Sequence, residues 1–301
     1  MQIVKGIDLF HSVHHDRVYL ALGNFDGVHV GHREIIRTTV DLAKEQGKKS
    51  AILLFFPHPL SILHPQHSPE LLITMEDRIA MLGEAGIDYV IIHPFTRDFA
   101  ALSPEQFARE ILRNKLSVAG VVVGFDYSFG SRGSGKPTDL QAMGKQYDFS
   151  VQVIEPVTVQ DEAVGSSAIR LLLTQGNVEK ASAMLGYPYY VRGTVVHGDG
   201  RGRTLGFPTA NLQLPPEVIR PANGVYLAKV AMAEQMFWAL TNVGTRPTFH
   251  KNETSVEVFL LDTKKNLYYE ELIVYFIQRM REEKSFIDAA ALIKQIQNDV
   301  R

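Results

Sequence analysis

Hydrophobic residues in the first half of the chain gather in short runs rich in β-branched residues, and stretches with helical spacing separate them. Five runs predict strands, at Val18–Leu22, Ala51–Phe56, Tyr89–Ile92, Val121–Val123 and Val151–Ile154. A helix is expected to begin at Ser103, where Ser, Pro, Glu and Gln follow one another as a capping box with proline at the first helical position. This alternation predicts a parallel sheet with helices on both faces, whose ligands bind at the carboxyl ends of the strands.

The pattern changes near Leu185–Tyr190, and from Tyr189 onward the chain is strand-rich with short polar joins. The β-rich stretches are YYVRGTVVHG, GVYLAKVAM, QMFWALTNVG, SVEVFLLD and LIVYFIQRM. Their spacing predicts a small antiparallel barrel, with a hairpin turn at Met232–Met236. One helix is expected to close the chain, capped by Ser285 with Asp288 and carrying an apolar stripe. The members of the stripe are Phe286, Ala290, Ile293, Ile296 and Val300.

Length and composition narrow the class of protein. A chain of 301 residues is too long for most single cores, so two domains are expected. The formal net charge of −2 gives no general attraction to nucleic acid or to membranes. Because there is no cysteine, disulfides, thiol nucleophiles and iron–sulfur clusters are excluded. The sequence contains no signal peptide and no membrane-spanning run, so a cytoplasmic protein is expected.

The segment GNFDGVHVGH, residues 23–32, lies where the first of these strands gives way to a helix. Gly27 and Gly31 allow a sharp turn and a close approach of the backbone to a ligand. A helix that begins near Gly31 offers N–H groups and a partial positive charge to phosphate, and His29 and His32 can add two donors. His32, rather than His29, is expected at the helix start. Zinc binding competes with this interpretation but lacks convincing third and fourth ligands nearby, and two surface histidines in a polar loop are the plainest alternative.

The part FDGVHVGH resembles the H-x-G-H signature of the nucleotidylyltransferase superfamily, in the form found in bacterial FMN adenylyltransferases. Three more motifs resemble that family in the same order: FFPHP at Phe55–Pro59, VVVGFDYSFG at Val121–Gly130 and VGSSAIR at Val164–Arg170. The resemblance spans most of residues 17–175. It implies transfer of an adenylyl group from ATP to FMN, with release of pyrophosphate.

The same resemblance implies which residues form the site. His29, His32 and Arg170 are expected to be catalytic, and Asp126 and Phe129 to lie on the flavin side. The residues expected to bind ATP and its phosphates are Gly23, Phe25, Gly31, Ser166 and Ser167.

Two features depart from the patterns they approach. Gly165 stands where the family usually has its first serine, and Ser167 replaces threonine, so weakened phosphate contacts are expected. The stretch GSRGSGKP at Gly130–Pro137 almost spells a phosphate-binding P-loop, but Pro137 stands where a magnesium-binding Ser or Thr is required and has no N–H. A mobile glycine-rich flap beside the flavin site, with Arg132 and Lys136 available to phosphates, is expected instead.

A second glycine-rich segment, GDGRGRTLGFPTANL at Gly198–Leu212, opens the strand-rich half. Backbone with so few side chains can wrap a polyphosphate beside an arginine. The residues expected there are Gly200, Gly202 and Arg203. Thr209 and Asn211 lie two apart on an extended segment, which puts a hydroxyl and an amide oxygen on one face, and such oxygens suit Mg²⁺ shared with phosphate. The alternative is a glycine-rich hairpin with structural Thr and Asn.

This segment resembles the riboflavin kinase signature, and NGVY, NVGTRPTF, SVEVFLLD and RMREEKSF extend the resemblance over residues 186–301. It implies a six-stranded Greek-key barrel that phosphorylates riboflavin. Glu257 matches the family's catalytic glutamate, and Arg281 matches a position expected near the flavin. Glu257 should face away from Val256 and Val258 on its strand, and an ordinary exposed strand residue is the alternative.

Together the motifs resemble prokaryotic bifunctional riboflavin kinase/FMN adenylyltransferases, also called bifunctional FAD synthetases. The resemblance implies an adenylyltransferase domain at residues 1–186 and a kinase domain at residues 187–301, with ATP, Mg²⁺, riboflavin, FMN and FAD as ligands. Two alternatives are an enzyme that keeps one activity, more readily the kinase, and a flavin- or nucleotide-binding sensor. A class I aminoacyl-tRNA synthetase fragment is set aside, because the chain has neither a K-M-S-K-S segment nor a basic surplus for tRNA.

Overall fold

The chain forms two compact units. The structure is a computed structural model that describes residues 1–14, 16–198, 206–247, 252–261, 265, 267–284 and 286–300. One unit comprises residues 1–70 and 74–164, and the other comprises residues 71–73 and 165–301. No helix in these described ranges is both long enough and apolar enough to cross a bilayer.

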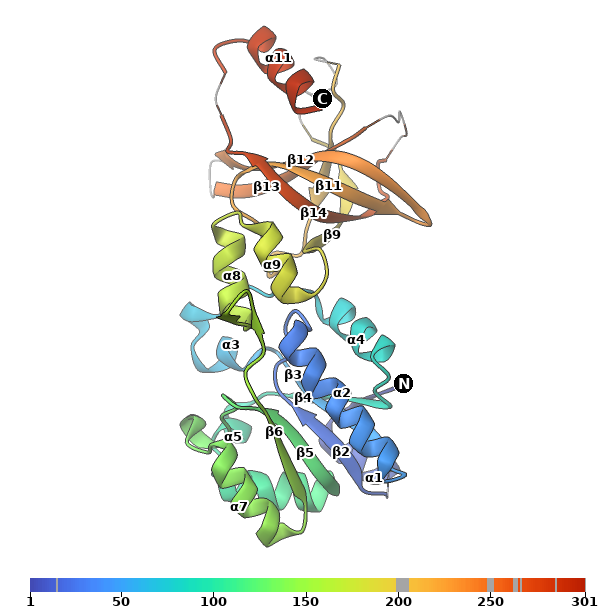
Figure 1. Ribbon diagram of the computed structural model, residues 1–301, viewed down its shortest axis with the longest axis vertical. Coiled ribbons are helices and arrows are strands. Elements are labelled where there is room, and N and C mark those ends of the chain that lie inside the picture. The colour runs from blue at the N-terminus through green and yellow to red at the C-terminus, as the bar shows by residue number, and fades with distance from the viewer. Residues whose placement is uncertain are drawn as a thin grey trace. The chain divides into compact units, whose positions relative to one another are not determined.

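The first unit is built on a six-stranded parallel sheet with the order β1-β4-β3-β2-β5-β6, which confirms the predicted α/β architecture (Figure 1). Its strands are β1 (Gln2–Lys5), β2 (Val18–Leu22), β3 (Lys49–Phe56), β4 (Tyr89–Pro94), β5 (Val118–Gly124) and β6 (Ser150–Ile154). Five of the six are the predicted apolar runs, some extended by a few residues. The sixth, β1, is an edge strand that pairs only with β4, and Val4 is its one buried residue. A single buried position is too weak a pattern to predict a strand.

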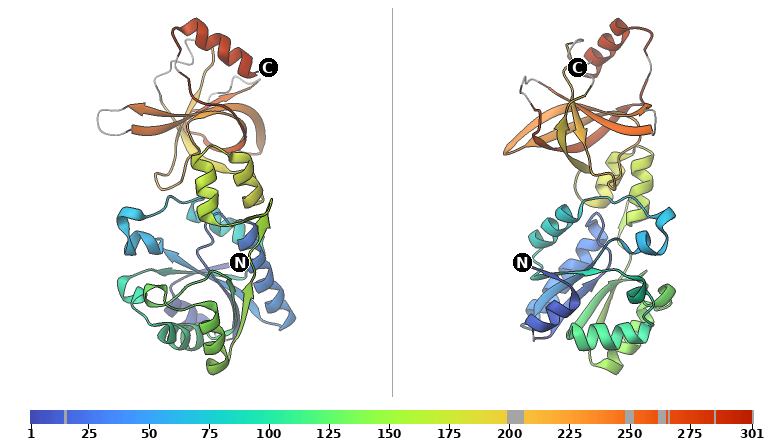
Figure 2. Two further views of the ribbon diagram at one scale, coloured as in Figure 1. Left: turned by 60° about the vertical axis from the view of Figure 1, so that its left-hand side comes forward. Right: turned by 180° about the vertical axis from the view of Figure 1, so that it is seen from behind.

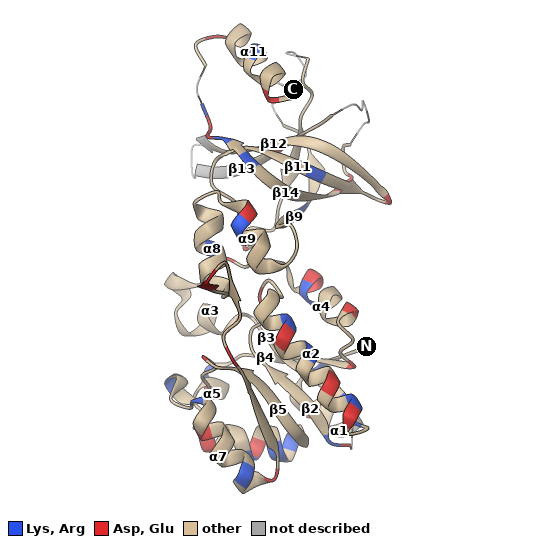
Figure 3. Ribbon diagram, in the orientation of Figure 1, with Lys and Arg blue, Asp and Glu red and all other residues tan. Residues whose placement is uncertain are grey.

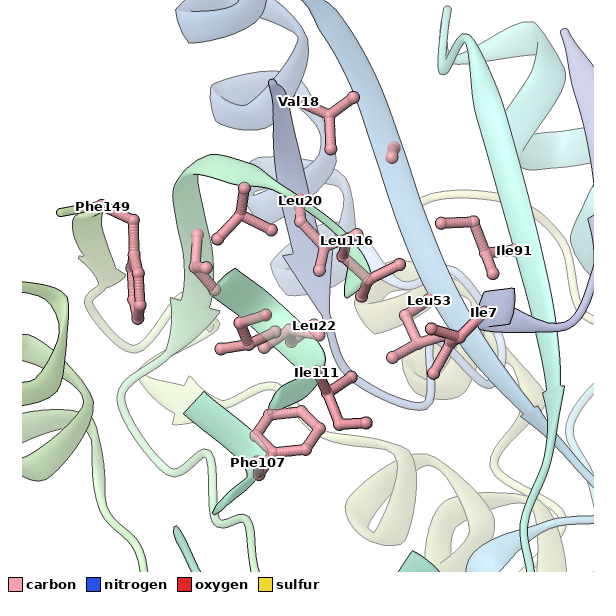
Figure 4. Packing of buried hydrophobic residues seen from close by; sticks show 14 of the residues in the cluster. Ile7, Val18, Leu20, Leu22, Leu53, Ile91, Phe107, Ile111, Leu116 and Phe149 are labelled. Atoms are coloured by element: carbon pink, nitrogen blue, oxygen red, sulfur yellow. The ribbon is translucent and has the colours of Figure 1, made fainter. Parts of the chain in front are cut away.

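Helices cover both faces of this sheet (Figures 1 and 2). On one face α2 (Val30–Glu45) packs against β2, β3 and β5. On the other face the strands meet α1 (Ile7–Val13), the π-helical segment η2 (Phe107–Lys115) and α7 (Pro137–Tyr147). Figure 4 shows this second layer, with Leu20 and Leu22 of β2 near Phe107 and Ile111 of η2. Because side chains alternate along a strand, Tyr19 and Ala21 are left for the α2 face.

Short elements connect these layers. They are α3 (Pro59–Leu63), η1 (Pro65–His67), α4 (Met75–Glu84), α5 (Arg97–Ala100), α6 (Pro104–Gln106), η3 (Ser131–Gly133), β7 (Thr158–Val159) and β8 (Glu162–Ala163). The predicted helix start at Ser103 is confirmed. The Gln106 backbone N–H donates to the Ser103 hydroxyl at 3.1 Å, and the Ser103 N–H donates to the Gln106 side-chain oxygen at 2.9 Å.

The second unit is a closed six-stranded antiparallel barrel with the order β10-β13-β12-β11-β14-β9. Its strands are β9 (Tyr190–Val196), β10 (Ala210–Gln213), β11 (Gly224–Met232), β12 (Gln235–Pro247), β13 (Asn252–Leu260) and β14 (Glu271–Arg281). The steps from β10 to β11 and from β13 to β14 join strands that are not neighbours, as in a Greek key. The predicted hairpin is confirmed, because Met232 pairs with Gln235 and Ala233 takes a left-handed turn conformation with φ of 50°.

Two helices precede the barrel within the second unit, α8 (Ser166–Thr174) and α9 (Val178–Leu185). The compact unit therefore begins well before residue 187, where the sequence analysis starts the kinase domain. Met184 and Leu185 of α9 are fully buried within this unit.

The closing helix α11 (Ala289–Val300) is present as predicted, but its cap differs. The carboxylate of Asp288 accepts a hydrogen bond from the Ala291 N–H at 2.8 Å, so Asp288 itself is the capping residue. Ser285, the predicted cap, lies outside the described residues. The apolar stripe is only partly covered, with Ile293 and Ile296 half-buried and no residue of α11 buried.

Candidate active sites

His29 is the N-cap of α2, so the helix begins at Val30, and the expectation that His32 occupies the helix start is wrong. Nδ1 of His29 accepts a hydrogen bond from the His32 backbone N–H at 3.2 Å. An accepting Nδ1 leaves the proton of neutral His29 on Nε2, which becomes a donor. The N–H groups of Val30 and Gly31, which a helix start cannot pair internally, lie beside it. Donors of this kind suit a phosphate.

His32 lies in the first turn of α2 and stacks on His29, with ring centroids 3.5 Å apart and planes 15° apart. The Phe25 ring lies 5.1 Å from the His32 ring on the centroid measure. Burial, with the neighbouring His29 and Arg78, holds the pKa of His32 well below its usual value of 6.5. Its Nδ1 is buried and has no hydrogen-bond partner in the described part of the chain. His32 is therefore a neutral imidazole that can serve as a donor without adding charge.

The glycines of this turn are constrained by its own aromatic side chains. A Cβ on Gly23 would lie 3.1 Å from the Phe25 ring, and one on Gly31 would lie 3.3 Å from Nδ1 of His29. Gly23, Phe25 and Gly31, all predicted as parts of the ATP site, thus pack together around the histidine pair.

Arg78 of α4 is a residue of this region that the sequence analysis missed. Its Nη1 donates to the Asn24 carbonyl at 3.0 Å, and its Nη2 donates to Asp26 Oδ1 at 3.2 Å. The ion pair is buried, because the side chains of Arg78 and Asp26 are 4% and 2% exposed. The signal was present on α4, where Met75, Arg78 and Leu82 share the buried face at helical spacing and a cation stands at an apolar position.

The two predicted flavin residues differ in exposure. Asp126 is exposed at the end of β5, whereas Phe129 is 5% exposed and packs 5.7 Å from the Phe107 ring. Phe129 exchanges backbone hydrogen bonds with Gly135 at 3.1 and 2.9 Å. Its buried ring therefore anchors the loop that follows β5 to the core. In this structure the Phe129 side chain belongs to the core.

The near-P-loop at Gly130–Pro137 is held at several points. The Ser131 N–H donates to the Leu102 carbonyl at 2.7 Å, and a Cβ on Gly130 would lie 2.7 Å from the Pro104 backbone nitrogen. The expectation of a mobile flap therefore finds no support here. Helix α7 begins at Pro137, which has no N–H, and the Lys136 N–H is bonded to Asp139, so neither residue offers an N–H to a phosphate.

Three predicted adenylyltransferase residues lie on α8, in the second compact unit. Ser166 and Arg170 are four residues apart and share one face of the helix, Ile169 is on the buried face, and Ser167 is exposed. Gly165 is the N-cap and makes no side-chain hydrogen bond. The helix start thus offers two hydroxyls and a guanidinium on a short stretch.

The barrel brings together Glu257, Thr209 and Asn211, as predicted for a phosphoryl-transfer site. Glu257 of β13 lies opposite Asn211 of β10 in the strand register, and Thr209 Oγ1 donates to Glu257 Oε2 at 3.4 Å. Val256 and Val258 are buried on the other side of the strand, which confirms the predicted direction of Glu257. This carboxylate, hydroxyl and amide form an oxygen-rich cluster.

Two further residues adjoin this cluster. Asn242 of β12, the first residue of the NVGTRPTF motif, lies opposite Glu257 on its other side. A Cβ on Gly198 would overlap the Asn211 side chain, so only glycine allows the chain to pass this close to the cluster. The predicted phosphate-binding residues Gly200, Gly202 and Arg203 follow directly but lie outside the described residues.

Arg281, predicted near the flavin, is held by α11. Its guanidinium donates to Asp299 through Nε at 3.0 Å and Nη2 at 2.8 Å, and the Gln295 side chain donates to the same carboxylate at 2.8 Å. The two charged side chains are 14% and 7% exposed. The closing helix therefore fixes the orientation of Arg281.

Comparison with known proteins gives matches to both halves of the chain. A family model described as FAD synthetase matches residues 11–168, and one described as riboflavin kinase matches residues 185–301. The bifunctional riboflavin kinase/FMN adenylyltransferase of Bacillus subtilis is 38% identical over 288 residues, covering 93% of this chain and 89% of that protein. The proteins of the same name from Listeria monocytogenes and Escherichia coli K12 are 37% and 34% identical, covering 93% and 99% of this chain and 89% and 96% of their own lengths.

Among solved structures, a crystal structure described as a macrolide-efflux protein from Streptococcus pneumoniae has the same fold. It matches with a TM-score of 0.90 and 30% identity, over 99% of this chain and 97% of that one.

Proposed function

The chain belongs to the family of bifunctional riboflavin kinase/FMN adenylyltransferases, which phosphorylate riboflavin and then adenylylate FMN to FAD, and we propose how its residues divide the two reactions. Residues 1–186 carry FMN adenylylation and residues 187–301 carry riboflavin phosphorylation. Support comes from two separate sets of phosphate-handling groups, the histidine pair at the start of α2 and the oxygen cluster around Glu257.

Adenylyl transfer needs positioning rather than a base. The second pKa of a phosphomonoester is about 6, so the FMN phosphate is already ionised when it attacks the α-phosphorus of ATP and displaces pyrophosphate. His29 donates through Nε2 and His32 as a neutral imidazole, while the helix N–H groups add a positive field. Ser166, Ser167 and Arg170 of α8 are assigned to phosphate binding in the same reaction by their match to the family motif. Charge on the reacting phosphorus is thereby stabilised without proton transfer.

Riboflavin phosphorylation does need a base, because the ribityl 5′-hydroxyl must lose its proton as it attacks the γ-phosphorus of ATP and displaces ADP. Glu257 takes that proton, and its hydrogen bond from Thr209 fixes the orientation of the carboxylate. The oxygens of Thr209 and Asn211 would hold a Mg²⁺ ion that comes with ATP, and the ion would neutralise charge on the phosphates. Gly200, Gly202 and Arg203, which lie outside the described residues, are assigned to those phosphates by their match to the family motif.

The flavin contacts are assigned by position. In the first unit Asp126 contacts the flavin from the end of β5, and Phe129 supports the loop from the core. In the barrel Arg281 lies on the flavin side, oriented by Asp299.

We place the enzyme in the cytoplasm, with flavins and ATP as its partners and no nucleic acid. The charge pattern gives no general attraction to nucleic acid, because acidic and basic residues are interspersed along helices such as α2 and the net charge is −2 (Figure 3).

Two single variants test the division of labour in the intact chain. His32→Ala should lower FMN-to-FAD turnover at least ~10²-fold and leave FMN formation near wild type. Glu257→Gln should lower riboflavin phosphorylation ~10²–10⁴-fold and leave FMN-to-FAD conversion intact. Both rates are measured by chromatographic separation of flavins after incubation with ATP and Mg²⁺.

Matched controls are His11→Ala, an exposed histidine of α1, and Glu271→Gln, whose carboxylate is exposed on β14. Neither should change either rate. Equal damage to both activities by either test variant would refute the assignment, as would stoichiometric zinc that disappears in His32→Ala.

A further inference from the structure

The turn that carries the histidine pair holds unfavourable backbone conformations. Phe25 and Val28 have φ values of 51° and 36°, and Gly27 lies between them with φ of 82°. A β-branched residue such as Val28 is an outlier at positive φ, and the left-handed region is unfavourable for every non-glycine residue. Such backbone persists only where its surroundings over-determine it. Contacts outside the turn must therefore stabilise it.

Those contacts include the hydrogen bond that Arg33 of α2 donates through Nε to the Val28 carbonyl at 3.1 Å, and two bonds from one side chain of α4. The guanidinium of Arg78, on α4, reaches both the Asn24 carbonyl and the Asp26 carboxylate, which flank the left-handed Phe25. A planar guanidinium can make two such bonds in fixed geometry, which an ammonium group cannot. Arg78 is 3% exposed, so it is closed off from solvent and from a bound substrate.

We propose that Arg78 is a positioning residue for adenylyl transfer, which holds Asn24 and Asp26 so that His29 and His32 keep their reactive geometry. The inference rests on the proposed roles of the two histidines and adds a residue that acts only through them. A displacement of about 1 Å at a reacting centre can cost ~10²-fold in rate. Loss of the Arg78 hydrogen bonds to Asn24 and Asp26 should therefore lower turnover.

A second effect of Arg78 acts in the same direction. Burial lowers the pKa of His32 most and His29 comes next, and the positive charge of Arg78 lowers it further. A neutral His32 is the form that can donate to phosphate beside the positive end of α2 without electrostatic conflict. The hydrogen bonds of Arg78 and its positive charge thus both support the proposed roles of His29 and His32.

A purely structural ion pair is the competing explanation, and a double variant separates the two. Buried ion pairs are often replaced by apolar residues at little cost in stability, whereas removal of one partner alone is strongly destabilising. Arg78→Met/Asp26→Leu should therefore unfold near the wild-type temperature. The same double variant has no donor for the Asn24 carbonyl, so it should not recover turnover.

The experiment measures both reactions in the full-length chain for the double variant, for Arg78→Lys and for a control. We expect kcat for FMN adenylylation to fall ~10–10²-fold in both variants, with KM for ATP and FMN changed less than about threefold and riboflavin phosphorylation within about twofold of wild type. The control is Arg37→Met, which removes an exposed arginine of α2 that pairs with Glu34 and should leave both rates unchanged.

Wild-type adenylylation in Arg78→Lys, or in a double variant as stable as wild type, would overturn the inference. So would a loss shared equally by both reactions. Failure of the underlying proposal is distinguishable, because it would appear as normal adenylylation in His32→Ala, whatever Arg78 does.

Discussion

His32 shows how burial can select the protonation state of a side chain. Its ring stacks on His29, and its Nδ1 is buried with no hydrogen-bond partner among the residues that the structure describes, so a proton added there would be held in a poorly solvated place beside Arg78. Desolvation disfavours the charged form of an imidazole. The helix start that attracts phosphate also repels an imidazolium. His29 and His32 can therefore donate hydrogen bonds as neutral side chains, while the helix start supplies the positive charge that attracts anions.

A first prediction concerns this protonation. In native protein the His32 imidazole should titrate with a midpoint well below 6.5, whereas in urea-denatured protein it should titrate near the ordinary value. Because the unfolded chain binds a proton that the folded chain does not, the free energy of unfolding should be unaffected above pH 6.5 and decrease as the pH falls below it. His32→Gln should weaken that dependence. NMR titration of histidine side chains measures the midpoint, and a native midpoint at or above 6.5 would contradict the prediction.

The residue scale also marks where sequence reasoning stops. The sequence singled out the two histidines, Glu257, Thr209 and Asn211. Neighbouring glycines, the alternation of strand residues and the order of the motifs pointed to them. Arg78 was missed because an arginine in an amphipathic helix is usually solvated, as Arg37 is, so its position on the apolar face was not enough to single it out, and only the fold brings α4 to the turn after β2. The partnership of Arg281 with Asp299 was hidden for the same reason.

At the scale of elements, the start of α8 gives a second prediction. Gly165 is an N-cap without a side-chain hydrogen bond, its φ of −166° suits any residue, and a Cβ there would meet no atom within 4 Å. Gly165→Ser should therefore fold normally and stabilise α8 by a few tenths of a kcal/mol through a capping hydroxyl.

The added hydroxyl would also stand beside Ser166 and Ser167. If this helix start binds phosphate, FMN adenylylation in Gly165→Ser should be equal to or faster than wild type, with KM for ATP lowered and riboflavin phosphorylation unchanged. Gly165→Ala, which adds the carbon without the hydroxyl, is the control. A slower reaction in the serine variant than in the alanine variant would count against a phosphate site here.

The closing helix gives a third prediction. No residue of α11 is buried, so the pair between Arg281 and Asp299 is a principal attachment of this helix. Asp299→Asn keeps the shape and removes the charge, which should cost about 1.5–3 kcal/mol locally. Amide exchange in α11 should accelerate and KM for riboflavin should rise several-fold, with adenylylation unchanged. Glu271→Gln, at an exposed pair with Arg192, should do neither.

Elements differed in how readily the sequence revealed them. Runs such as Val18–Leu22 were predicted to the residue because every position of β2 is buried. The edge strand β1 carries too few buried positions to form a pattern, and only the extended segment around Asn211 was predicted of the four-residue β10. The cap of α11 was misplaced because Ser285 and Asp288 both suit an N-cap, and local sequence does not say which one the helix uses.

At the scale of the whole molecule, the compact units and the proposed functional domains do not coincide. Helices α8 and α9 belong to the barrel's unit, yet α8 carries Arg170, which we assign to adenylyl transfer. Bonds within the second unit tie them to the barrel. The Ala222 N–H donates to the Leu173 carbonyl at 2.9 Å, and Arg279 donates to the Asn223 carbonyl at 2.6 Å and to the Gln175 carbonyl at 3.5 Å.

The last prediction follows from this mismatch and compares two fragments, residues 165–301 and residues 187–301. Both should phosphorylate riboflavin and neither should make FAD, because both lack the histidine pair. The shorter fragment loses fully buried Met184 and Leu185, each worth about 1.5–3 kcal/mol. Its thermal transition should therefore lie ~10 °C or more below that of the longer fragment. FAD from either fragment would refute the division of labour, and equal unfolding temperatures would show that α8 and α9 do not stabilise the barrel.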